Sequence, residues 1–135
     1  MPINPAAYTK KYMKLLRSLL AVTSVLGVVF IATAWRIVPP WLLSMLLIGF
    51  AGFVAATVLA FLDRAEGYWL GMVLAVTVLA ISLPAPAHIF FLTSGRALES
   101  GIFLVGNLLQ IVYVAAFIRY ILLRRRLSRG PSQPP

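Results

Sequence analysis

Four long apolar runs, at about residues 15–35, 41–62, 68–92 and 101–123, occupy most of this 135-residue sequence. A helix needs roughly 20 apolar residues to cross a bilayer, and each run is long enough. Hydrophobic residues make up 61% of the chain and charged residues 11%, whereas soluble domains are typically about half apolar and about a quarter charged. We therefore predict an all-α membrane protein with four transmembrane helices.

The connections between the runs are short, which predicts two antiparallel hairpins. Pro39 and Pro40 form the first turn, and Trp35 and Trp41 flank it as side chains typical of the membrane interface. Asp63–Glu66 forms a second, polar turn. Around the transmembrane domain (15–123) we expect a basic amphipathic lead-in (1–14) and a basic, disordered tail (124–135).

The basic residues predict the orientation. Ten of the 12 lysines and arginines fall on one side of a four-span topology and two on the other. Because cytoplasmic segments carry the excess of Lys and Arg, we expect both termini and the Asp63–Glu66 turn in the cytoplasm, in a prokaryotic cell membrane. The basic residues on the expected outer side are Arg36 and Arg96. Those on the expected cytoplasmic side are Lys10, Lys11, Lys14, Arg17, Arg64, Arg119, Arg124, Arg125, Arg126 and Arg129.

The net charge of +9 gathers at the ends of the membrane region, which indicates anionic lipid headgroups and not nucleic acid as the partner. The residues expected to bind headgroups are Lys10, Lys11, Lys14, Arg17, Arg124, Arg125, Arg126 and Arg129. The basic start followed by an apolar run and Ala32-Thr33-Ala34 also resembles a signal peptide with its cleavage site. The length of the run and the three runs after it favour a retained first span.

The third run is interrupted at Pro84 and Pro86, where we predict a broken helix. A proline has no backbone N–H, so the carbonyls of Ala80 and Ser82 lose their helical donors. Freed carbonyls in hydrocarbon need other partners. The single histidine, His88, follows this break and is expected near the outer surface.

Two amide side chains of the fourth run, Asn107 and Gln110, lie at the depth of the freed carbonyls, at ~1.5 Å per residue. We predict that they donate hydrogen bonds to Ser82 and Ala80 and fix the register of this hairpin. In an alternative interpretation, a small polar cavity binds a quinone or a lipid headgroup. Its lining residues would be Asn107, Gln110, Tyr113, Ser82 and His88.

Small residues at helical spacing occur on the second and third runs. They allow helix backbones to approach closely in lipid. If the two runs form a hairpin, Ala60 faces Gly71 and Ala56 faces Ala75; the alternative is a homodimer contact. The predicted packing residues are Gly49, Gly52, Ala56, Ala60, Gly67, Gly71 and Ala75.

This chain lacks residues that several functional classes need. The chain has no cysteine and one histidine, so we expect no metal site and no cofactor. No Asp, Glu, Lys or Arg lies deep in any run, whereas proton pathways usually contain one. We therefore expect no enzyme and no proton-coupled transporter.

These observations favour an accessory or assembly subunit of a membrane complex, which acts through helix–helix contacts with a membrane-protein partner or as a homo-oligomer. One alternative is a small oligomeric channel or carrier for an uncharged or lipid-like solute, lined by Asn107, Gln110 and Tyr113. Another alternative is a holin-like pore former.

Overall fold

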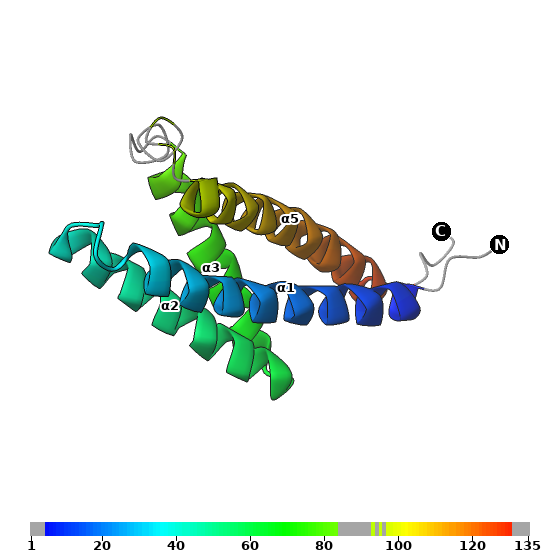
Figure 1. Ribbon diagram of the computed structural model, residues 1–135. Helices are drawn as coiled ribbons and strands as arrows, with labels where there is room; N and C mark the ends of the chain where they lie inside the picture. The colour runs from blue at the N-terminus through cyan, green and yellow to red at the C-terminus, as the bar shows by residue number, and fades with distance from the viewer. Residues whose placement is uncertain (1–4, 84–92, 94, 96, 131–135) are drawn as a thin grey trace.

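The computed structural model describes residues 5–83, 93, 95 and 97–130, and these residues form four helices and no strand. The helices are α1 (Pro5–Ala34), α2 (Pro40–Phe61), α3 (Ala65–Ser82) and α5 (Ala97–Ser128) (Figure 1). Each contains a stretch long and apolar enough to cross a membrane. The predicted fold class is therefore confirmed, and the chain is a multi-pass integral membrane protein.

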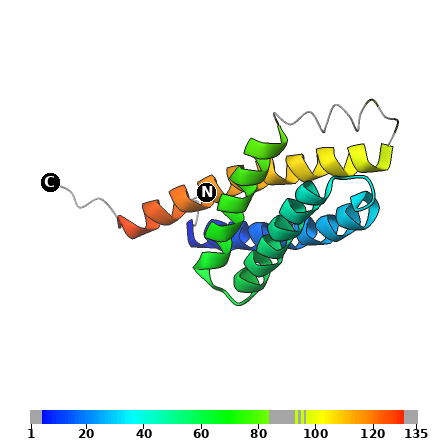
Figure 2. The same cartoon turned by 90° about the vertical axis from the view of Figure 1, so that its left-hand side faces the viewer.

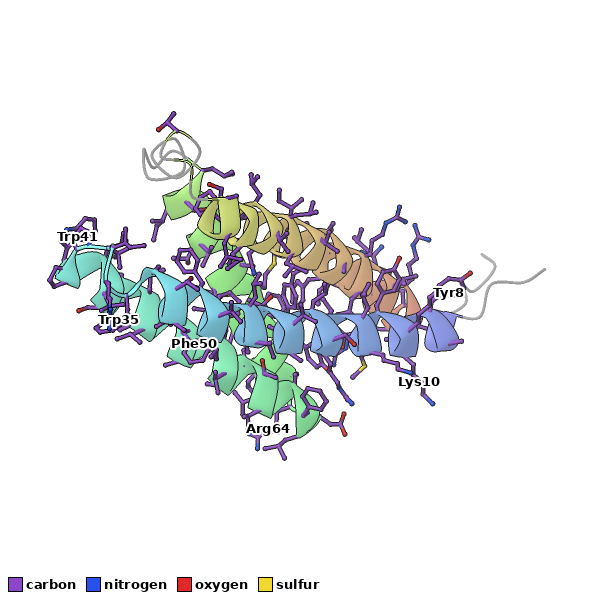
Figure 3. The ribbon with its side chains drawn as sticks, viewed as in Figure 1. Tyr8, Lys10, Trp35, Trp41, Phe50 and Arg64 are labelled. Carbon is purple, nitrogen blue, oxygen red and sulfur yellow. The ribbon has the colours of Figure 1, made fainter. Side chains whose placement is uncertain are left out.

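The four helices form a bundle in which α1 packs against α2 and α5, and α3 packs against the same two helices. The start of α1 and the end of α5 lie at one end of the bundle, and the turn between α1 and α2 lies at the other (Figure 1). The two views show α3 steeply inclined to α1 and α5 (Figure 2). Figure 3 shows Tyr8 and Lys10 far from Trp35 and Trp41, at opposite ends of α1 and its turn.

The helices differ in length. At ~1.5 Å per residue, the 30 residues of α1 and the 32 of α5 span about 45 and 48 Å. The 22 residues of α2 and the 18 of α3 span about 33 and 27 Å. Because the hydrocarbon core is about 30 Å thick, α1 and α5 continue beyond it. Helix α5 includes residues 124–128, which were predicted to be disordered; Arg and Leu are good helix formers, and cations are favourable at a helix C-terminus.

The turn between α2 and α3 is a Schellman motif. The Asp63 amide donates to the Ala60 carbonyl over 3.1 Å, and the Arg64 amide donates to the Leu59 carbonyl over 2.9 Å. Asp63 has a φ of 57°, a left-handed conformation that glycine usually occupies. The chain therefore reverses within Leu62–Arg64, and α3 begins at Ala65.

The core lies in one half of the bundle. We call residues 5–22, 51–75 and 110–128, the half nearer the chain ends, the proximal half, and residues 23–50, 76–83 and 97–109 the distal half. All members of the buried hydrophobic cluster belong to the proximal half: Leu16, Leu19, Leu20, Phe53, Ala56, Ala60, Tyr68, Ala75, Tyr113, Ala116, Phe117 and Tyr120. Among the described distal residues, Ala34, Ser100 and Ile102 are buried.

Helix α3 ends at Ser82, directly before the predicted break. Leu83 keeps a helical conformation, and its amide donates to the Leu79 carbonyl over 3.1 Å. Pro84, Pro86 and His88 lie outside the described residues.

Candidate functional site

A polar network joins the helices in the proximal half. The Arg17 guanidinium on α1 forms an ion pair with Asp63 in the α2–α3 turn. Its Nε also donates to the Tyr68 hydroxyl on α3 over 2.9 Å. The Arg17 side chain is 28% exposed and the Asp63 side chain 71%. Arg17 was predicted to bind headgroups, but its guanidinium is held by the protein itself.

The network continues to α5 through Tyr113. Its hydroxyl donates to the Tyr68 backbone carbonyl over 2.9 Å, and both residues are buried. Gly71 makes room for this contact, because a Cβ at Gly71 would lie 2.5 Å from the Tyr113 hydroxyl oxygen. Arg17, Asp63, Tyr68 and Tyr113 therefore connect α1, the α2–α3 turn, α3 and α5.

Aromatic rings surround the network. The Trp69 and Phe117 rings meet edge to face at a centroid distance of 4.9 Å. Tyr68 and Tyr120 lie 6.2 Å apart, and Tyr113 and Phe117 stack at 6.4 Å. Residues 113, 117 and 120 share one face of α5, since they lie three or four positions apart. Such pairs contribute about 0.5–1.5 kcal/mol each beyond their buried area.

The amides of α5 bond partners other than those predicted. The Asn107 side-chain oxygen accepts a 2.5 Å hydrogen bond from the Ser82 hydroxyl, and its nitrogen donates to the Phe103 carbonyl over 2.9 Å. Gln110 donates to the Thr23 hydroxyl on α1 over 3.3 Å. Side chains three positions apart on a helix point in directions that differ by about 60°. Asn107 therefore faces α3 while Gln110 faces α1, and the predicted bonds to the Ser82 and Ala80 carbonyls are replaced.

The same geometry bears on the interpretation that one cavity is lined by Ser82, Asn107, Gln110 and Tyr113. The three α5 side chains bond three different sites, on α3 near its end, on α1 and on α3 near its start. Gln110 and Tyr113 are buried, and Asn107 and Ser82 are half-buried. The structure thus brings Ser82 and Asn107 together, whereas Gln110 and Tyr113 bond other partners.

Several interhelical contacts involve residues that the sequence did not single out. The hydroxyls of Ser24 on α1 and Thr57 on α2 lie 3.0 Å apart. Thr23, Asp63 and Tyr68 are likewise partners of predicted residues. An available signal was the cation in the first run: a side chain such as Arg17 inside an apolar helix needs a partner, and Asp63 is an acid on the same predicted side.

The small residues pack within one chain, in a different register from the predicted one. A Cβ at Gly67 would lie 2.5 Å from the Ala60 nitrogen and 2.7 Å from the Ala56 carbonyl oxygen. Gly67 and not Gly71 therefore faces Ala60, because the Schellman turn starts α3 earlier than assumed.

The other predicted packing positions differ in their surroundings. A Cβ at Gly52 would lie 3.0 Å from a Leu74 methyl carbon, and Ala75 is fully buried. A Cβ at Gly49 would have no neighbour within 4 Å. Gly52 and Ala75 therefore lie within the bundle, whereas Gly49 faces open space on the surface of α2.

The remaining residues predicted to bind headgroups are exposed and lie at the proximal ends of α1 and α5. They are Lys10, Lys11, Lys14, Arg124, Arg125, Arg126 and Arg129. Helices α1 and α5 continue past the end of α2 on this side of the bundle (Figure 1).

Comparisons with protein-family models, with curated proteins and with solved structures find no match for this chain.

Proposed function

We propose that the chain is a non-catalytic accessory or assembly subunit of a membrane complex, which acts through contacts of its helices with a partner membrane protein. The observation that carries this proposal is the use of its polar side chains within the membrane. Asn107, Gln110 and Tyr113 each bond another helix of the same chain. They join the helices to one another, and the large exposed side chains of the membrane spans are mainly apolar.

The same observation weighs against a channel or carrier. In a channel or carrier, the polar groups along the pathway must bind the solute, so they must be able to release the protein groups that they bond when no solute is present. Here Asn107, Gln110 and Tyr113 each bond another helix, and these bonds would have to break for a solute to bind to the same groups. A protein whose interhelical amide and hydroxyl groups bond one another is suited to present a defined surface to another protein, although the buried Ser100 hydroxyl has no hydrogen-bond partner among the described residues.

The outward surface of α2 supports contact with a partner. Its large exposed side chains are apolar, with Ile48 73% exposed. The open space at Gly49 lies on the same helix. Because lipid tails are as apolar as leucine, close helix contact in a membrane depends on shape, and small residues permit it.

The test is purification from native membranes in a mild detergent, with chemical cross-linking before solubilisation. We expect a stable membrane-protein partner at a fixed ratio to the chain. Gly49→Leu introduces a side chain that the chain's own packing accommodates, and Gly101→Leu is the matched control at a second glycine with an open Cβ position. A chain that is recovered alone after both cross-linking and mild extraction contradicts the proposal.

We propose further that both termini face the cytoplasm of a prokaryotic cell membrane. The lack of native cysteine allows single-cysteine labelling without background. Ser128→Cys should be protected from a membrane-impermeant maleimide in spheroplasts, and Arg36→Cys should react. The reverse pattern overturns the orientation.

A further inference from the structure

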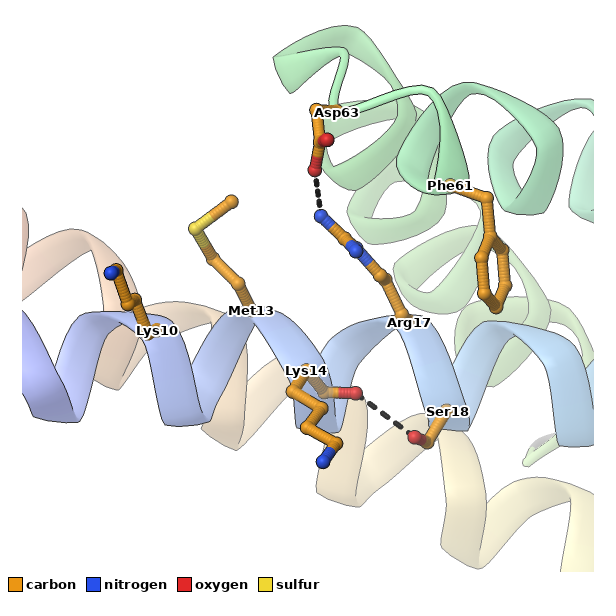
Figure 4. Close-up of a pocket in the computed structure, with 7 residues that line it drawn as sticks. All are labelled: Lys10, Met13, Lys14, Arg17, Ser18, Phe61 and Asp63. Carbon is orange, nitrogen blue, oxygen red and sulfur yellow. Dashed lines mark hydrogen bonds and ion pairs between the residues drawn. The ribbon is translucent and has the colours of Figure 1, made fainter.

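A shallow depression lies between the proximal part of α1 and the end of α2 (Figure 4). Its volume is about 560 Å³. Helix α1 contributes Lys10, Met13, Lys14 and Arg17, and the end of α2 and its turn contribute Phe61 and Asp63. The depression is therefore built from two segments far apart in the sequence.

The depression lies where the apolar span ends. Phe61 is the last residue of α2, and the polar turn follows it. Lys10 and Lys14 precede the apolar run of α1, which starts at about residue 15. Phosphate groups of lipids occupy this boundary between hydrocarbon and water, so a lipid reaches the depression without leaving the bilayer.

The charge in the depression is positive. Three cations and one carboxylate line it, and the carboxylate of Asp63 is bound by Arg17. Neither Lys10 nor Lys14 forms an ion pair within the part of the chain that the structure describes. Lys10 and Lys14 lie four positions apart on α1; in Figure 4 the Lys10 side chain extends on the side of Met13, and the Lys14 side chain extends to the other side of the helix. Their unbranched side chains let both ammonium groups turn toward one anion.

Apolar side chains lie beside these cations. Met13 and Phe61 line the same depression, and an acyl chain that leaves the headgroup has an apolar surface to follow. A free phosphate ion makes no use of such a surface. The combination of two unpaired ammonium groups with Met13 and Phe61 fits a molecule with an anionic head and an apolar tail.

We infer that the depression binds one anionic phospholipid, with its phosphate held by Lys10 and Lys14 and the start of an acyl chain against Met13 and Phe61. Arg17 is kept from the phosphate by its ion pair with Asp63 and serves to fix the wall of the site. This inference is independent of the proposed accessory role, because it concerns a lipid and not a protein partner.

The test is native mass spectrometry of the full chain in detergent with added phosphatidylglycerol, and with phosphatidylcholine in parallel. We expect one phosphatidylglycerol per chain, bound at least tenfold more tightly than phosphatidylcholine. Lys10→Gln and Lys14→Gln should each weaken binding about fivefold. Lys11→Gln is the matched control, since Lys11 is an exposed neighbour on α1 that does not line the depression. It should change binding less than twofold.

Three results would overturn the inference. Equal losses in Lys11→Gln and Lys10→Gln indicate a diffuse attraction of the basic ends to anionic lipid. Equal affinity for the two lipids shows that the headgroup charge is not recognised. Displacement of phosphatidylglycerol by excess inorganic phosphate, with no dependence on Met13→Ser or Phe61→Ser, identifies a site for the phosphate ion alone.

Discussion

The proximal and distal halves of the bundle are both largely apolar, but they are packed differently. The proximal half contains the buried aromatic cluster, the Arg17–Asp63 pair and the backbone contact at Gly67. In the distal half, α1 and α2 diverge from α3 (Figure 2), and Ser82–Asn107 joins α3 to α5. The comparison indicates that the half near the chain ends fixes the arrangement of the helices. The distal half, which lacks a buried aromatic cluster among its described residues, is expected to separate at a smaller free-energy cost.

The largest expected effect is that of Gly67→Ala. The added methyl group would meet backbone atoms of α2 at 2.5 and 2.7 Å, and backbone cannot rotate away as a side chain can. We expect a loss of about 2–3 kcal/mol in the free energy of unfolding. Gly49→Ala is the control and should be neutral or stabilising by up to about 1 kcal/mol, because alanine favours helix and the site is open. Unfolding by SDS titration, followed by tryptophan fluorescence, measures both; equal stabilities would refute the close contact.

A smaller loss is expected for Tyr113→Phe. The ring stays in the cluster, but the hydrogen bond to the Tyr68 carbonyl is removed. The free energy of unfolding should fall by about 1 kcal/mol. Tyr120→Phe removes a hydroxyl from the same face of α5 without removing this bond, and it should retain the wild-type stability. If the two variants behave alike, the Tyr113 hydroxyl is not a link between α5 and α3.

Removal of the Arg17–Asp63 ion pair is expected to cause the next largest loss of stability. Asp63→Asn keeps a residue that tolerates the left-handed conformation and removes the carboxylate charge from Arg17. Because Asp63 is largely exposed, we expect a loss of only about 0.5–1 kcal/mol, which shrinks in high salt. Glu66→Gln breaks a pair exposed on both sides and should have no measurable effect. The double variant Asp63→Asn/Arg17→Gln should lose no more free energy of unfolding than the two single variants lose together.

The smallest effect belongs to the distal half. Ser82→Ala removes its hydrogen bond to Asn107, and we expect a loss of about 0.6 kcal/mol or less. Thr77→Val is a control on the same helix, since the Thr77 hydroxyl bonds the Val73 carbonyl one turn away. A loss in Ser82→Ala as large as that in Tyr113→Phe would mean that the two halves are held equally.

The four helices were predictable because the length of an apolar run is a local property. The polar turn at Asp63 follows from the same pattern, whereas the helix bounds do not: α1 begins at Pro5, α3 at Ala65, and α5 extends to Ser128. The partners across helices were not predictable, since a sequence does not say which side of a helix faces which neighbour. Gln110 shows this: its depth was estimated from its position, but its direction toward Thr23 depends on where α1 lies. The register error at Gly67 has the same origin, because the Schellman turn shortens the connection.

The Arg17–Asp63 pair also bears on the order in which the chain is made. Its partners are 46 residues apart, and both are synthesised before α3 and α5. The pair links the first hairpin to itself, so it needs no later segment to form. Gln110 and Tyr113, by contrast, reach back across 87 and 45 residues from the last helix. The first hairpin can therefore form its ion pair before α3 and α5 are made. The contacts of α5 with α1 and α3 can form only after α5 has been synthesised.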